Sequence, residues 1–254
     1  MIKQKRYEMI MELVDKMRIV PIDDFCEKLG VSRATVRRDL IYMDEANMLK
    51  RTHGGAVSLV RQALEDMPVS MRQRMYKEEK GRIADVAAGM IRDGSTIFIG
   101  SGTTLRELAL RLRDFRKLTV LTNDIDVAYD ISQRTSNDLI VAGGILKQPT
   151  ATLIGSITED ILRDLHVETA FLSADSAKPK TGFMDKNINE VMIKRLVIKN
   201  STKSVMLCDQ SKFSANAFAT ICPFSGVDLT ITNGEMDPKL EHELQEEGMT
   251  LQFA

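Results

Sequence analysis

Tryptophan is absent from this 254-residue chain, and aromatic residues make up only 5% of it. This scarcity disfavours the aromatic stacking platforms that bind single-stranded nucleic acid. Histidine is also scarce, since the chain contains only His53, His166 and His242. None of them has metal-ligand spacing to a cysteine or to another histidine, so we expect no metal site.

Cysteine is as rare as histidine. Cys26, Cys208 and Cys222 are odd in number, lie far apart and have apolar neighbours, which predicts buried, reduced thiols. No apolar run reaches the roughly 18 residues that span a bilayer, and the first ten residues lack the apolar core of a signal peptide. We therefore expect a cytoplasmic protein with no membrane partner.

Neither sign of charge dominates, because 35 basic and 36 acidic side chains give a net charge of −1. This balance disfavours a general polyanion binder and leaves room for a local basic surface. The composition, 43% apolar and 28% charged, is that of an ordinary soluble globular protein. The length allows one large domain, or a medium-sized domain with a small companion.

The first 45 residues contain three apolar repeats of helical spacing. The first two repeats comprise Ile10, Leu13, Val14 and Met17, and then Ile22, Phe25, Cys26 and Leu29. Gly30 is expected to end the second helix in a left-handed conformation. Ser32 is well placed to cap the third helix.

The third predicted helix has an apolar side and a polar side. Val36, Leu40 and Met43 fall within about 60° of one another and predict its buried face. The opposite side and its flank hold Ala34, Thr35, Arg37, Arg38 and Tyr42. Small residues and arginines near the start of such a helix are typical of one that enters a major groove. Arginine can read guanine there, and threonine or alanine can contact a thymine methyl group.

A predicted hairpin follows, because short apolar-alternating pieces flank His53-Gly54-Gly55 in LKRTHGGAVSLV. Its basic start suits contact with phosphates or the minor groove, so the module is predicted to be a winged helix-turn-helix. The candidate DNA-contacting residues are Ser32, Arg33, Ala34, Thr35, Arg37, Arg38, Tyr42, Lys50, Arg51 and His53. The alternative is a three-helix protein-interaction module with a solvated basic face.

From Ile83 onward, helical and strand patterns alternate, which predicts a mainly parallel sheet with helices on its faces. Helices are expected over 81–91, 103–112, 124–132 and 188–200. Strands are expected over 96–100, 118–122, 138–142, 169–174, 204–208 and 228–232. Ligands of such sheets bind beyond the carboxyl ends of the strands.

Small, amide and charged residues follow five of these strands. They are Ser101, Gly102, Thr103, Thr104, Asn123, Gly143, Gly144, Asp175, Asp209 and Lys212. Helix-start amides and hydroxyls favour a phosphate, glycines allow close backbone approach, and lysine adds positive charge. A phosphorylated, hydroxylated ligand is therefore predicted. Each feature also has a structural alternative: simple turns for SGTT and the glycine pair, and an i, i+4 surface pair for Glu190 and Lys194.

Motifs over nearly the whole chain carry a family resemblance. The stretch LGVSRATVRRDLIYMDEANMLKRTHGGA closely resembles the N-terminal module of the DeoR family of bacterial transcriptional regulators, with its Arg-Arg-Asp-Leu helix and His-Gly-Gly-Ala wing. IFIGSGTT, LTVLTN, VAGGILKQPTATLIG, NEVMIKR and MLCDQSKF resemble motifs of that family's regulatory domain. The resemblance implies a domain similar in fold to ribose-5-phosphate isomerase and CoA transferases that senses phosphorylated sugars or related metabolites.

The strand ends and the family motifs together define a candidate effector site. Its residues are Lys80, Ser101, Gly102, Thr103, Thr104, Asn123, Gly143, Gly144, Asp175, Glu190, Lys194, Asp209 and Lys212. A helix-surface lysine is the alternative for Lys80. The chain departs from the family pattern at Gly100 and Asn233, where Asp is usual. It departs again in LSADSAKPKTGF, where Ser173 and Ser176 replace glycines and Lys178 and Lys180 are added.

We expect three parts: a winged helix-turn-helix domain over 1–57, a linker over 58–80, and an effector-binding and oligomerisation domain over 81–254. The expected function is a repressor of a carbohydrate-utilisation operon that binds double-stranded operator DNA as a dimer or tetramer and responds to a phosphorylated sugar. No cofactor or catalytic residue is expected, because none of the candidate acids can be assigned as a general base. The alternatives are an isomerase-like enzyme with a DNA-binding appendage and an architectural DNA-binding protein.

Overall fold

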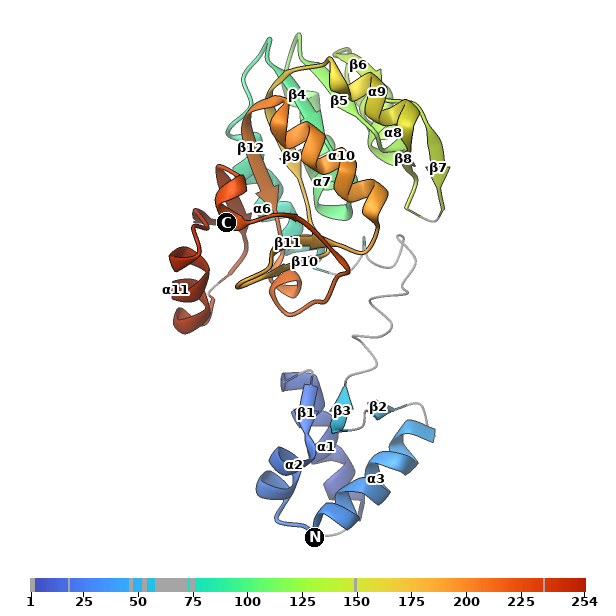
Figure 1. Ribbon diagram of the computed structural model, residues 1–254, viewed down its shortest axis with the longest axis vertical. Coiled ribbons are helices and arrows are strands. Elements are labelled where there is room, and N and C mark those ends of the chain that lie inside the picture. The colour runs from blue at the N-terminus through green and yellow to red at the C-terminus, as the bar shows by residue number, and fades with distance from the viewer. Residues whose placement is uncertain are drawn as a thin grey trace. The chain divides into compact units, whose positions relative to one another are not determined.

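The computed structural model describes residues 3–17, 19–45, 48–51, 54–57, 73, 76–148, 150–234 and 236–254. The predicted DNA contact His53 lies outside these residues, and for Lys50 only the backbone is described. The chain divides into two compact units, Met1–Pro68 and Val69–Ala254 (Figure 1). The three-part division at residues 57 and 81 stays a prediction.

The first unit has three helices and a small antiparallel sheet. Its elements are α1 (Lys3–Met17), β1 (Ile19–Pro21), α2 (Ile22–Leu29), α3 (Arg33–Glu45), β2 (Lys50–Arg51) and β3 (Gly55–Val57). The strand order is β1-β3-β2, and buried side chains from all three helices form one core. The predicted helices and hairpin are confirmed, whereas β1 was not predicted.

Local sequence signals specify the turn between α2 and α3. Gly30 has a φ of 63°, and its N–H donates to the Cys26 carbonyl, so it ends α2 as expected. The Ser32 hydroxyl accepts a hydrogen bond from the Thr35 N–H at 3.3 Å, which satisfies one of the free amides at the start of α3. A left-handed glycine and a capping serine therefore define this helix-turn-helix.

The second unit is built on a parallel sheet of seven strands in the order β15-β14-β12-β9-β4-β5-β6. Every neighbouring pair is parallel. The strands are β4 (Thr96–Ile99), β5 (Thr119–Thr122), β6 (Asp138–Val141), β9 (Val167–Leu172), β12 (Ser201–Leu207), β14 (Leu229–Thr232) and β15 (Leu251–Phe253). The predicted architecture is confirmed, and β15 is the strand of this sheet that was not predicted.

Helices cover both faces of this sheet (Figure 1). One face carries α6 (Lys77–Ala88), α7 (Thr103–Ala109) and α8 (Ile125–Arg134), and the other carries α9 (Ser156–Arg163) and α10 (Ile188–Lys199). Along β4, the side chains of Ile97 and Ile99 enter the core beneath α6, α7 and α8. The side chain of Phe98 enters the core beneath α9 and α10. Successive strand residues point to opposite faces, so both faces of a central strand are apolar.

Several smaller elements were not predicted from the sequence. They are the hairpin of β7 (Ile145–Lys147) and β8 (Thr152–Ile154), a separate antiparallel sheet of β10 (Ser176–Lys178), β11 (Gly182–Asp185) and β13 (Ala219–Cys222), the helix α9, and α11 (Pro238–Glu246). These strands have three or four residues each.

All three cysteines are free thiols, as expected. Cys208 is fully buried, and burial raises the pKa of its thiol to about 12. Cys26 and Cys222 are only half-buried, so the expectation of burial is wrong for these two. Burial still raises the pKa of the Cys222 thiol to about 11, which leaves little thiolate at neutral pH.

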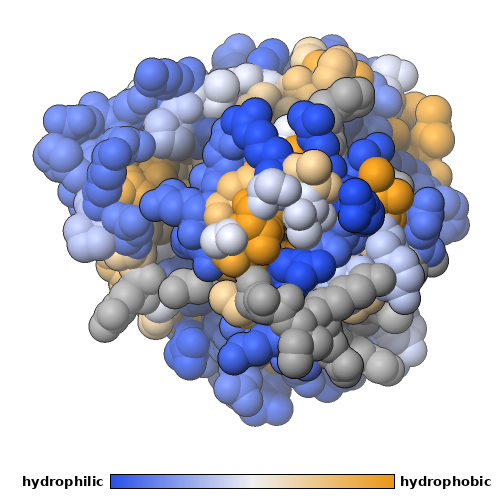
Figure 2. Space-filling model, turned by 90° about the horizontal axis from the view of Figure 1, so that it is seen from below, coloured by the Kyte–Doolittle hydropathy of each residue, from blue (hydrophilic) through white to orange (hydrophobic). Residues whose placement is uncertain are grey.

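The surface carries charged and polar groups over most of the face seen in Figure 2. Apolar side chains on this face form separate patches. Among the residues that the structure describes, no helix is both long enough and apolar enough to cross a membrane.

Candidate functional sites

The polar side of α3 is open to solvent. The helical spacing predicted its faces correctly, because Val36, Leu40 and Met43 are fully buried. Thr35 is half-buried, and the exposed residues are Ser32, Arg33, Ala34, Arg37, Arg38 and Tyr42. Arg33 forms an ion pair with Asp23 of α2. In the hairpin, Arg51 of β2 is also exposed.

Asp39 anchors this helix from its buried side, a role that the sequence analysis missed. It is 4% exposed and pairs with Arg6 of α1 through two contacts, Nε to Oδ2 and Nη2 to Oδ1, the latter at 3.1 Å. The hydrogen bond that Arg6 donates to Asp39 raises the pKa of the Arg6 guanidinium. Tyr7 also stacks on Tyr42, with ring centroids 5.4 Å apart. Thus α1 sets which side of α3 faces outward.

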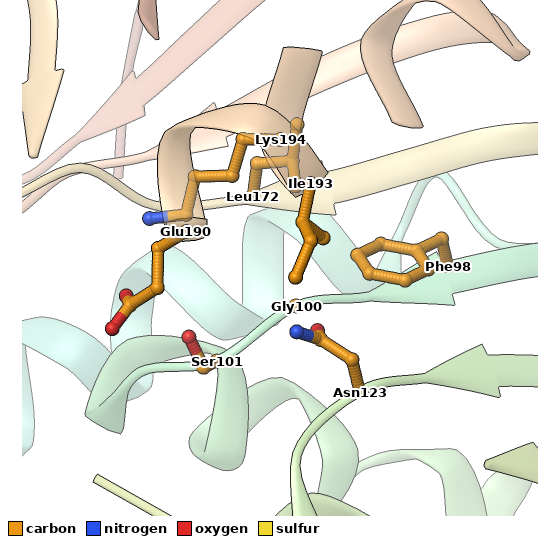
Figure 3. A pocket seen from close by; sticks show the side chains of 8 residues that line it. All are labelled: Phe98, Gly100, Ser101, Asn123, Leu172, Glu190, Ile193 and Lys194. Atoms are coloured by element: carbon orange, nitrogen blue, oxygen red, sulfur yellow. The ribbon is translucent and has the colours of Figure 1, made fainter. Parts of the chain in front are cut away.

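A pocket lies in the second unit, at the carboxyl ends of β4, β5 and β9. Its walls are Phe98, Gly100, Ser101, Asn123, Leu172, Glu190, Ile193 and Lys194. Figure 3 shows the Ser101 hydroxyl and the Asn123 amide facing the space below Ile193, with the Glu190 carboxylate at its left side. The volume is about 210 Å³, including the part open to solvent.

The pocket brings together four residues of the predicted effector set, namely Ser101, Asn123, Glu190 and Lys194. Its apolar wall was not predicted, because an apolar residue within a strand or helix signals only burial. Gly100 also lies in the wall. A Cβ atom at this position would lie 3.3 Å from the Phe98 ring and 3.4 Å from Leu172.

Lys194 is a buried cation. It is 6% exposed, its Nζ lies 2.6 Å from Oδ2 of Asp185, and it donates to the Ser173 carbonyl at 2.7 Å. Glu190 instead pairs with Lys147 of β7 at 2.5 Å, so the alternative of an i, i+4 surface pair is wrong. Burial opposes the charge of Lys194, but the carboxylates of Asp185 and Glu190 raise its pKa above the usual value.

Three carboxylates act on Lys194, and of these Asp175 and Glu190 were predicted as site residues whereas Asp185 was not. Asp185 ends β11 and is 1% exposed; burial raises its pKa. A single acid at the end of an unpredicted strand has no pattern that marks it. Burial opposes ionisation of Asp175, but the charges of Lys194 and Lys212 hold its pKa below the usual value. Lys212 therefore acts on the same carboxylate as Lys194, although it does not line the pocket.

Asn123 and Asp124 join the end of β5 to α8. The Asn123 side chain donates to the Leu153 carbonyl at 2.9 Å, and Asp124 caps α8 by accepting from the Val127 N–H at 2.9 Å. Burial raises the pKa of Asp124 to about 6, although the hydrogen bond from Val127 opposes this change. Asp124 is therefore partly protonated near neutral pH.

The stretch from Ser101 to Thr104 makes the turn from β4 into α7. Gly102 has a φ of 136°, which favours glycine, and its carbonyl accepts from the Arg106 N–H at 2.9 Å. Ser101 and Thr103 are half-buried, and Thr104 is 3% exposed. Among these four residues, Ser101 lines the pocket.

Gly143 and Gly144 follow β6 and do not line the pocket. A Cβ atom at Gly144 would lie 2.1 Å from Oγ1 of Thr158 in α9. That hydroxyl donates to the Gly143 carbonyl at 2.8 Å. A close approach between this turn and α9 therefore explains Gly144. A Cβ atom at Gly143 would meet nothing within 4 Å.

The remaining predicted residues lie near the sheet or in its loops. Lys80 is 4% exposed, so the alternative of a helix-surface lysine is wrong. Asp209 is equally buried and caps the turn Gln210–Phe213 by accepting from the Ser211 N–H at 3.0 Å. Lys178 bonds to Asn216, and neither it nor Lys180 lines the pocket.

Comparison with known proteins matches both units. Residues 6–62 match the DeoR-like helix-turn-helix domain, and residues 75–234 match the DeoR C terminal sensor domain. The chain is 30% identical to the HTH-type transcriptional regulator GolR of Listeria innocua over 252 residues, covering 98% of both chains. It is 32% identical to the glycerol-3-phosphate regulon repressor of Escherichia coli over 229 residues, covering 90% of both.

Solved structures also match part of this chain. Ribose 5-phosphate isomerase A from Methanocaldococcus jannaschii aligns with 54% of this chain and 55% of its own. Its TM-score is 0.40 and its sequence identity is 18%.

Proposed function

Because this chain belongs to the DeoR family of DNA-binding transcriptional regulators, we propose that it is a repressor whose affinity for operator DNA changes when a phosphorylated sugar binds the larger unit. The observation that carries this proposal is the pocket at the carboxyl edge of the sheet. Its polar groups come from α10 and from the ends of β4 and β5.

The proposed DNA contact is the exposed side of α3. Arg37 and Arg38 are exposed there. Ala34, which lies closer to the start of the helix, is exposed as well. An arginine fork can bond bidentately to guanine in the major groove. The exposed Arg51 of the hairpin would add a phosphate or minor-groove contact. Arg33 is a weaker candidate for base contact, since Asp23 already neutralises it.

The proposed ligand contact combines charge and hydroxyl recognition. The Ser101 hydroxyl and the Asn123 amide lie in the wall with Glu190 and the buried Lys194. Lys212 supplies a second cation beside Asp175. Lysine serves phosphate recognition as a point charge, while carboxylate and amide groups accept and donate hydrogen bonds to sugar hydroxyls. The glycerol-3-phosphate regulon repressor is a relative of this chain by sequence, and its name fits a ligand of this chemical class.

A ligand changes operator affinity only if it binds one state of the protein more tightly than another. A ligand that binds one state tenfold more tightly contributes about 1.4 kcal/mol per site toward it. Several sites in one dimer or tetramer add their contributions. We infer regulation without turnover, because the relatives compared above are regulators by name and binding alone is enough to shift the equilibrium.

A ligand screen tests the ligand half of this proposal. Thermal unfolding of the full chain should be followed with ribose 5-phosphate, fructose 1-phosphate, fructose 6-phosphate and glycerol 3-phosphate, and with the same compounds lacking phosphate. A ligand at 100 times its Kd stabilises the folded state by about 2.7 kcal/mol, so at least one phosphorylated compound should raise the Tm. K212A should lose most of that increase. The control K239A removes an exposed lysine of α11 and should keep it.

Equal effects of phosphorylated and unphosphorylated compounds would contradict the proposed recognition of phosphate. Loss of the response in K239A as well as K212A would show that general charge, and not this site, is responsible. Conversion of any of these sugars to an isomer by the purified chain would favour an enzyme.

A further inference from the structure

One edge of the seven-stranded sheet exposes large apolar side chains on three adjoining elements. We call this surface the β6 edge; it comprises Ile125 and Tyr129 of α8, Ile140 and Val141 of β6, and Ile157 and Ile161 of α9. Their exposed fractions lie between 36 and 62%. The two pairs on the helices are four residues apart, so each pair occupies one helix face.

The three elements are joined closely. The helices α8 and α9 cover opposite faces of the sheet at its β6 end, and Figure 1 shows them flanking this edge. The Thr158 hydroxyl of α9 bonds to the carbonyl of Gly143, two residues beyond β6. On β7, Ile145 lies within 3.6 Å of the Cβ position at Gly155, the residue that precedes α9. The apolar groups therefore form one continuous end of the unit.

The backbone of β6 adds unpaired hydrogen-bonding groups to this surface. In the part of the chain that the structure describes, β6 is an edge strand and pairs only with β5. Soluble proteins usually protect such an edge with lysine, proline, a bulge or a covering segment. The strand reads DLIV, with its one charge at the first position, Asp138, so it has none of the usual protective residues at its centre.

We propose that a second copy of this chain covers the β6 edge, with the two β6 strands pairing antiparallel across a twofold axis. In an antiparallel pair centred on Ile140, Ile140 faces its own counterpart and Asp138 faces Ala142 of the other copy, so the two Asp138 carboxylates stay apart. The self-complementary surface suits the twofold contact that most homodimers use. The sheets of the two copies would then join edge to edge.

The exposed area fits such a contact. With Ile145 and Leu146 of β7, the side chains of this edge expose on the order of 700 Å², taking about 200 Å² for one fully exposed large side chain. The largest apolar patch of a typical monomer is roughly 300–600 Å². A standard interface buries about 800 Å² on each partner. The estimated area exceeds the first value and approaches the second, so this edge is large enough for a contact with a second copy of the chain.

This inference rests on the proposed function in one respect: a helix-turn-helix regulator that reads repeated half-sites needs at least two copies. The contact would hold two copies of α3 in one assembly. Linking two DNA-binding modules in this way raises operator affinity by roughly 10²–10⁴-fold without any new DNA contact.

Sedimentation of the full chain over a range of concentrations tests the surface. We expect an assembly whose mass is halved by Y129R and by I157R, which place a charge on opposite helices of the edge. F218R is the matched control, because Phe218 is the most exposed of the large apolar residues described, at 80%, and lies next to the β10-β11-β13 sheet, away from β6. That variant should keep the mass of the unsubstituted chain.

Cysteine cross-linking provides a second readout that does not depend on a disruptive charge. I140C should form a disulfide between copies under mild oxidation, because directly opposed residues of an antiparallel pair have Cα atoms about 4.5–5.5 Å apart. F218C should not. A monomeric unsubstituted chain would overturn the proposal, as would folded Y129R and I157R variants that keep their mass while I140C stays uncross-linked. In either case specific operator binding by the unsubstituted chain would leave the proposed function standing.

Discussion

Single residues divide into those that a pattern reveals and those that only the fold reveals. The spacing of Val36, Leu40 and Met43 was enough to identify the buried side of α3, and the structure confirms it. No spacing could reveal Asp185 as the partner of Lys194, because the two are nine positions apart and the connecting segment changes from strand to helix. Charges that meet through tertiary structure leave no signal in a single sequence.

Asp124 is the residue whose protonation should affect stability most simply. Its pKa is raised by burial to about 6, from 3.8. Between these two pH values the folded chain holds a proton that the unfolded chain has released, so the free energy of unfolding falls as the pH rises through this window. The total is at most about 3 kcal/mol, since each pH unit contributes about 1.4 kcal/mol.

The variant D124N should remove this contribution while keeping the cap on α8, because asparagine caps a helix as well as aspartate does. Urea unfolding at a series of pH values from 4 to 7 would measure it. We expect the stability of D124N relative to the unsubstituted chain to increase with pH across the window. Parallel stability curves for the two proteins would mean that the buried carboxyl does not titrate there.

Elements were predicted well where they are long and repeat a period. Six of the seven strands of the parallel sheet were found because each is an apolar run between helical patterns. The strand β15 follows a helix that was not predicted, and the strands of the two small sheets do not alternate with α-helices. Strand order could not be predicted, since it depends on which strands pair in space. The glycine pair after β6 was correctly marked as special, but the structure explains Gly144 by its contact with α9.

The two glycines offer a matched test of this explanation. G144A should lower the free energy of unfolding by about 1–3 kcal/mol, because its Cβ would lie 2.1 Å from the Thr158 hydroxyl. G143A should change it by less than about 0.5 kcal/mol, since nothing lies within 4 Å of that position. Urea unfolding of both variants measures the difference. Equal stability of the two would refute the close contact between this turn and α9.

At the scale of the whole molecule, one chain joins a helix-turn-helix unit to a sensor domain. The family assignment rests on matches in both units, and the sequence motifs had already pointed to it. The identity of the ligand could not be predicted, because the pocket wall combines residues from β4, β5, β9 and α10 that only the fold assembles. For the same reason, the apolar residues of that wall could not be predicted from the sequence as part of the pocket.

Operator affinity measured with and without ligand is the most direct test of the central claim. Duplex DNA that the full chain selects from a random library should be titrated in the absence and presence of the phosphorylated compound that stabilises it most. We predict that the ligand changes operator affinity at least tenfold for the unsubstituted chain, and that K212A binds the operator equally well but does not respond. R38A should bind weakly in both conditions, because it lacks an arginine on the exposed side of α3. An operator affinity that saturating ligand leaves unchanged would contradict the account.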